Sequence, residues 1–230
     1  MMFNKSRKWS FPPELKYEDG EIVQSVTETV LLGVVISEDL RWQKNTKYIC
    51  TKARKKLWII QRSKILNLSK HQLLDIYIKE VRSILEMAVP VWHPGLTQRE
   101  KSEIESVQKL ALKIILGHSY QSYRQAREFF CLDTLEQRRS ELCLKFAKKN
   151  IQSENCFFTR IDQSVISRRK PDLVKEYTCN TKRFQRTSLP YLASVLNNNH
   201  RGTWNPLSLD NVSCYLWTMR VQPSLLFWRL

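Results

Sequence analysis

The spacing of apolar residues divides the chain into a short strand-like part and a longer helical part. From Phe11 to Ile36 the sequence is rich in β-branched residues, as strands are. The Asp19-Gly20 pair favours a tight turn because both residues can adopt positive φ. The run LLGVVI around Gly33 is typical of a strand inside a sheet, and the glycine permits close approach of another backbone. We expect a hairpin or small meander within a β-unit over residues 1–40.

Beyond this unit the apolar residues recur with a period of about 3.6, which predicts helices as far as about Asn150. Capping boxes begin helices at Ser69 and Thr97, because the side chains three residues apart can satisfy free backbone N–H groups. Pro90 and Pro94 are expected to end the helix that begins at Ser69. The predicted helices span about 42–62, 69–89, 97–116, 122–130 and 134–149.

The periodicity weakens after Ile151. We expect an irregular segment over residues 151–198 and a disordered tail over 199–230, where neither a clear period nor caps are found. The predicted fold is therefore mainly α. It has a small N-terminal β-hairpin or meander, a multi-helix domain over 41–150 and a poorly ordered C-terminal tail.

Charge narrows the possible partners. The chain has 38 Lys and Arg against 22 Asp and Glu, a net charge of +16, which attracts nucleic acid or an anionic membrane surface. No apolar run is long enough to span a bilayer, and the N-terminus lacks the apolar core of a secretory signal. We expect an intracellular protein, nuclear or cytoplasmic and not secreted, with nucleic acid as partner and no membrane.

The basic charge is concentrated in the segment RWQKNTKYICTKARKKLWIIQRSK, which contains no acid and interleaves aromatic residues. As a helix it has an apolar stripe of Ile49, Ala53, Leu57 and Ile60. We predict that its other faces bind nucleic acid through Lys44, Lys47, Arg54, Lys55 and Arg62. The helix over 134–149 is expected to bury Leu135, Leu142 and Phe146 and to form a second basic surface with Arg138, Arg139, Lys145, Lys148 and Lys149.

Catalytic and metal-binding patterns are not found. Glu18-Asp19 belongs to the predicted turn and Glu38-Asp39 to the start of a helix, so neither forms the carboxylate pair of a two-metal site. The cysteines form no C-x-x-C pair and glycine is too rare for a phosphate-binding loop. His93 has no recognisable nucleophile and carboxylate partners, so we expect a packed or exposed histidine. We predict no catalytic residues, no metal and no cofactor.

Three segments together carry a family resemblance: LLGVVISEDLRWQKNTKYICTKARKKLWIIQR, RSILEMAVPVWHPGLTQREKSEIESVQKLALKIILG and LDTLEQRRSELCLKFAKK. In order and spacing they resemble reverse transcriptases, or RNA-directed DNA polymerases, of jockey-like non-LTR retrotransposons, in the region after the catalytic palm. The resemblance covers about residues 1–198, whereas 199–230 match nothing we recognise. It implies that Leu31, Leu32 and Gly33 correspond to the leucine-glycine motif that helps position the primer strand. The helices would correspond to the thumb, which holds the template and primer duplex.

The departure from the family concerns catalysis. The fingers, most of the palm and the tyrosine-alanine-aspartate-aspartate motif should precede this sequence. The resemblance thus implies a non-catalytic transposable-element fragment, not an enzyme as it stands, able at most to bind template and primer nucleic acid without sequence preference. Two alternatives remain. One is an inert or protein-interaction helical domain with a solvated basic face, and the other is a fragmentary gene model of a complete RNA-directed DNA polymerase.

Overall fold

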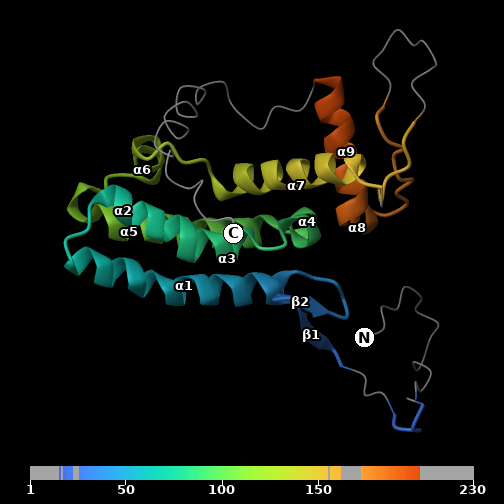
Figure 1. The fold of residues 1–230 in the computed structure, drawn as a ribbon, viewed down its shortest axis with the longest axis horizontal. Helices are drawn as coiled ribbons and strands as arrows, with labels where there is room; N and C mark the ends of the chain where they lie inside the picture. The colour runs from blue at the N-terminus through green and yellow to red at the C-terminus, as the bar shows by residue number, and fades with distance from the viewer. Residues whose placement is uncertain (1–15, 17, 23–25, 155, 162–171, 203–230) are drawn as a thin grey trace, which may run out of the picture.

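The computed structural model describes residues 16, 18–22, 26–154, 156–161 and 172–202. Within these residues the chain is mainly helical and has one small two-stranded antiparallel sheet near its N-terminus, which confirms the predicted fold class. Figure 1 shows helix α1 (Gln43–Ile65) along one edge of the helical array, with the hairpin below the end where the helix begins.

The hairpin consists of β1 (Glu28–Leu31) and β2 (Val34–Ser37), paired from Glu28 with Ser37 to Leu31 with Val34. Its turn contains Leu32 and Gly33, whose φ angles are 48° and 81°. The prediction that LLGVVI forms one continuous strand was therefore wrong, because these two residues reverse the chain. The expected turn at Asp19-Gly20 is present beside an antiparallel bridge between Lys16 and Ile22, while Phe11 to Glu14 lie outside the described residues.

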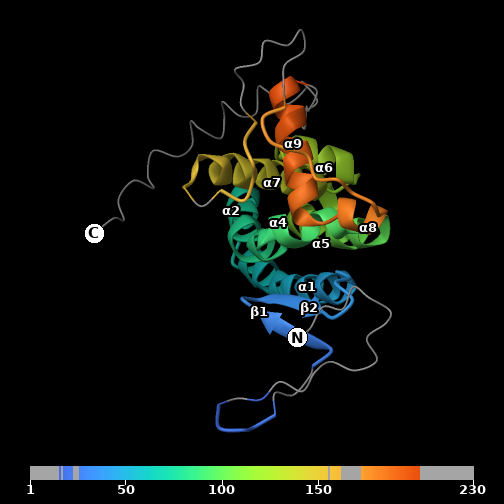
Figure 2. The ribbon, with the colours of Figure 1, turned by 90° about the vertical axis from the view of Figure 1, so that its right-hand side faces the viewer.

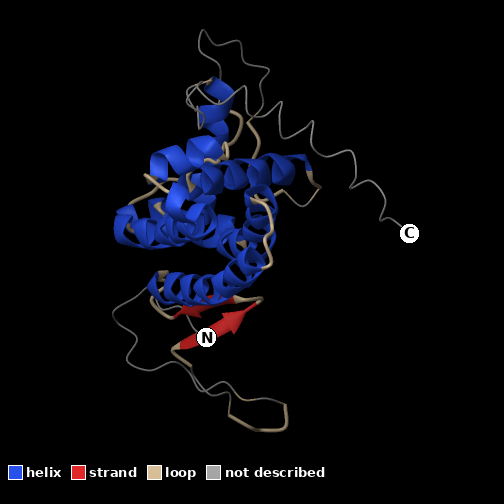
Figure 3. Cartoon of the chain, turned by 90° about the vertical axis from the view of Figure 1, so that its left-hand side faces the viewer, coloured by secondary structure: helices blue, strands red, loops and turns tan. Residues whose placement is uncertain are grey.

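One strand attaches the hairpin to the helices. Val34 and Val35 are buried, and the Val35 N–H donates to Asn45 Oδ1 of α1 over 3.1 Å. Every residue of β1 is exposed. At Gly33 an added Cβ would lie 2.6 Å from Met87 Cε, so the turn also approaches the helical array closely. Figure 3 shows the two strands on the outer side of α1, where they are part of the helical domain's surface.

The predicted apolar stripe of α1 is confirmed, since Ile49, Ala53, Leu57 and Ile60 are all buried. The helix packs mainly against α5 (Gln98–Leu116) and against the helical segment that begins at Ser69. That segment runs through α2 (Lys70–Ile76), the π-helical η1 (Tyr77–Arg82) and α3 (Ser83–Glu86).

The capping boxes of Ser69 and Thr97 both form as predicted. The prolines, however, do not end the second helix. Ala88, with φ of 51°, ends it, and Pro90 lies in the first turn of α4 (Val89–Trp92). A proline is accepted there because the first N–H groups of a helix have no partner to lose. Pro94 follows in the 3₁₀ turn η2 (His93–Gly95).

Three further elements follow α5: the 3₁₀ turn η3 (Gly117–Ser119), the predicted short helix α6 (Tyr123–Phe129) and α7 (Leu135–Gln152). The expected buried face of α7 was partly wrong. Leu135 is buried, but Phe146 is 41% exposed and the helix buries Arg139 and Cys143 instead. The physical reason is that α4, α5 and α9 (Ser188–Arg201) all pack against α7, so more than one of its faces is covered.

The segment 151–198 is not irregular throughout. Residues Lys182–Gln185 form α8, and α9 extends through position 201, past the boundary expected for the tail. α9 buries Leu192, Ala193, Val195 and Leu196. The rest of the predicted tail, 203–230, lies outside the described residues.

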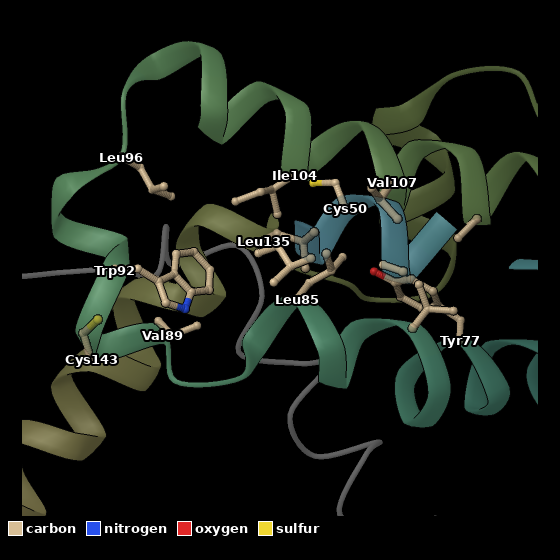
Figure 4. Close-up of a cluster of buried hydrophobic side chains, with 14 of the residues drawn as sticks. Cys50, Tyr77, Leu85, Val89, Trp92, Leu96, Ile104, Val107, Leu135 and Cys143 are labelled. Carbon is tan, nitrogen blue, oxygen red and sulfur yellow. The ribbon is translucent and has the colours of Figure 1, made fainter. Parts of the chain in front are cut away.

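One hydrophobic core connects these helices. Figure 4 shows Trp92, Leu85 and Tyr77 pointing toward Ile104 and Leu135. All five are at most 1% exposed. Among the described residues no helix is long and apolar enough to cross a bilayer.

Candidate nucleic-acid interface

Helix α1 presents a cationic stripe opposite its buried stripe. At 3.6 residues per turn, six outward residues fall within one sector of about 80° around the helix axis: Lys44, Lys47, Thr51, Lys55, Trp58 and Arg62. All of them are exposed and α1 contains no acid. The stripe extends from Lys44 to Arg62, a rise of about 27 Å along the helix. We call this surface of six residues the α1 stripe.

The predicted cations of α1 are not all equally available to bind a phosphate. Lys44 Nζ lies 2.6 Å from Glu28 Oε2, and this hydrogen bond raises the pKa of Lys44. Arg54 donates to Ser106 Oγ over 3.0 Å and lies 3.9 Å from Glu103. Among the described residues Lys47, Lys55 and Arg62 form no ion pair. These three side chains can therefore meet phosphates without losing an internal partner.

Two aromatic side chains accompany the cations. Trp58 is 59% exposed and Tyr48 is 37% exposed on the same helix. Lys52 Nζ lies 5.8 Å from the centre of the Tyr48 ring. Exposed aromatic faces beside cations are a common platform for unpaired bases, because a base can stack while its phosphate is neutralised.

The hairpin adds a wall beside the stripe. A shallow groove between the hairpin and α1 is lined by Val30 and Val35 on one side and by Lys44, Lys47 and Tyr48 on the other. The residues of the leucine-glycine motif lie at the hairpin tip. Leu31 is 58% exposed and Leu32 is 90% exposed, while Gly33 faces Met87.

The predicted second basic surface on α7 was wrong for Arg139. This side chain is fully buried, its Nε donates to His93 Nδ1 over 3.3 Å, and neither of its terminal nitrogens has a hydrogen-bond partner among the described residues. Burial lowers the pKa of Arg139. Arg138 pairs with Glu86 over 2.8 Å. The basic side chains left exposed on this helix are Lys145, Lys148 and Lys149.

His93 belongs to a buried polar cluster that the sequence did not reveal. Its Nε2 lies 3.4 Å from Ser140 Oγ and its Nδ1 accepts from Arg139, 46 positions away. Burial, followed by the charges of Arg139 and Lys101, lowers the pKa of His93 to about 3. A serine–histidine pair needs a carboxylate that stabilises the imidazolium, and here a cation occupies that side. The cluster is therefore not suited to general-base catalysis.

No group of three metal-ligating side chains is present in the part of the chain that the structure describes. The α1 stripe is thus the strongest candidate site, and its chemistry is that of a phosphate-binding surface.

Comparisons of the chain with protein-family models, curated proteins and solved structures find no match.

Proposed function

We propose that this chain binds nucleic acid without sequence preference through the α1 stripe, as a non-catalytic remnant of a retrotransposon reverse transcriptase. The observation that carries the proposal is the division of α1 into a buried apolar face and an acid-free cationic face. Such a face neutralises phosphates, which are the same for every sequence. Base identity should therefore have little influence on affinity.

The assignment to a reverse transcriptase rests on the resemblance of the three segments. Under this assignment the exposed hairpin tip at Leu31–Gly33 would help to position the primer strand. In this arrangement the tip and the stripe lie on adjoining elements, where a duplex could contact both. We place the protein inside the cell, in the nucleus or cytoplasm. It needs no cofactor and carries out no polymerisation on its own, because its sequence contains no carboxylate pair for two metals.

A salt titration of binding tests the proposal. Each phosphate contact contributes about 0.9 to the slope of log affinity against log salt for B-form duplex. The variant Lys47→Ala/Lys55→Ala/Arg62→Ala should bind every duplex sequence more weakly and have a slope shallower by about 2.7. The variant should keep its helix content, because alanine is a good helix former.

A matched control separates local contacts from general charge. Lys145→Ala/Lys148→Ala/Lys149→Ala removes the same number of exposed cations from α7. We expect this control to retain most of the slope. An equal loss in both variants would mean that the net charge of +16, and not the α1 stripe, attracts the duplex.

A further inference from the structure

A second groove adjoins the hairpin groove along α1. Three distant parts of the chain form it: the hairpin end with the first turns of α1, the start of α5, and α8 with the start of α9. Figure 2 views this end of the molecule, where α8 and α9 lie above α1 and the hairpin. We call it the α1–α8 groove. Its cations are Arg41, Lys47, Arg54, Arg99, Lys182 and Arg186.

The acids of this groove already have partners. Glu100 Oε2 accepts from the Thr97 N–H over 2.6 Å and from the Thr97 hydroxyl over 2.7 Å, because it completes the cap of α5. Glu103 pairs with Arg54. Two carboxylates thus line the groove with six cations, and a further acid, Asp39, lies 3.6 Å from Arg41. The groove keeps an excess of positive charge, because four of its cations form no ion pair among the described residues: Lys47, Arg99, Lys182 and Arg186.

An aromatic side chain lies among these cations. Trp42 is half-buried and lines the groove. An added Cβ at Gly95 would lie 2.5 Å from the indole, so only glycine lets the ring occupy this position. A cationic groove with an aromatic surface matches how proteins hold single strands, in which the backbone follows the charge and bases stack on rings.

The two grooves are continuous. Lys47 and Thr51 line both of them, and they belong to the α1 stripe. A strand that leaves a duplex on the stripe would reach the α1–α8 groove without crossing a neutral surface. The groove is lined by α1 on one side and by α8 and the start of α9 on the other, so a strand lying in it would meet cations from both sides.

We propose that the α1–α8 groove binds the single-stranded extension of a nucleic acid whose duplex lies on the α1 stripe. This inference rests on the proposed function. It assigns a role to Arg99, Lys182 and Arg186, which lie outside the stripe and which the sequence pattern did not mark.

The test compares a blunt duplex with the same duplex carrying a single-stranded oligothymidine extension, by fluorescence anisotropy over a range of salt. The wild-type chain should bind the tailed probe more tightly. Arg99→Ala/Lys182→Ala/Arg186→Ala should bind both probes equally, with its affinity for the blunt duplex unchanged. Its salt slope for the tailed probe should fall by about 2, since single-strand contacts contribute about 0.7 each. Circular dichroism checks that the variant is folded.

A stripe variant makes the outcomes distinguishable. Lys55→Ala/Arg62→Ala should weaken both probes and preserve the preference for the tail, because neither residue lines this groove. If the wild-type chain binds the blunt duplex but does not prefer the tail, the inference fails and the proposed function stands. If the groove variant weakens both probes by the same factor, the inference also fails. If the wild-type chain binds neither probe, both proposals fail. If polyglutamate competes with the tailed probe as strongly as oligothymidine does, the groove binds an acidic polypeptide and the inference is overturned.

Discussion

Helices α1 and α7 are both rich in Lys and Arg, yet the fold treats their charges differently. α1 is covered on one side, so its cations lie opposite the core and remain in solvent. α7 is in contact with α4, α5 and α9, and this covering buries Arg139 completely. The number of cations on a helix therefore does not define a binding surface. The number of faces that the neighbouring helices cover decides it.

The largest expected difference between the two helices concerns stability. Arg139→Ala should destabilise the protein by about 3 kcal/mol, because it leaves a cavity in the core. Arg139→Met should cost about 1 kcal/mol or less, since it fills the space and removes a buried cation that has no acid partner. Lys55→Ala, on the exposed face of α1, should change stability by no more than about 0.5 kcal/mol. Urea unfolding measures all three, and an alanine variant at position 139 as stable as the wild type would contradict the burial.

Acid should destabilise the α7 region through His93. Its pKa is about 3 in the folded protein and about 6.5 when unfolded. The unfolded state then binds more protons. The contribution of His93 to the free energy of unfolding is therefore fully present above pH about 6.5, and it falls as the pH decreases toward 3, by at most about 1.4 kcal/mol per pH unit.

The variant His93→Gln provides the control, because it cannot titrate. Between pH about 6.5 and 4 the wild-type chain should lose about 3 kcal/mol more than this variant. Parallel curves would show that His93 is charged in the folded state.

The smallest expected effect concerns helix caps. Thr134 accepts from the Gln137 N–H over 3.1 Å and caps α7, whereas Trp42 gives α1 no side-chain cap. Thr134→Ala should therefore cost about 1 kcal/mol. Trp42→Ala should affect α1 through lost packing only and should leave its capping unchanged. Thermal unfolding, followed by circular dichroism, compares the two variants, and an unchanged midpoint for Thr134→Ala would argue against the capping role.

Much of the helical architecture could be predicted from the chain. The predicted capping boxes at Ser69 and Thr97 both form, because a cap needs only residues three positions apart. The buried face of α1 was equally accessible, since apolar residues that recur at steps of three and four share one side of a helix and leave the basic residues on its other faces. α9 was missed, although Pro190 in its first turn is a helix-start signal. Its residues Leu192, Val195 and Leu196 recur at helical spacing, so the period was present as well.

By itself the sequence determined most of the helices between residues 42 and 149 and the orientation of α1, because caps, periodicity and charge act within a few residues of one another. The tertiary structure decided where Arg139 lies, which cations Glu28, Glu86 and Glu103 pair with, and which side chains share the α1–α8 groove. These outcomes depend on packing between residues that are far apart along the chain. A local pattern contains no information about which neighbour will cover a given face.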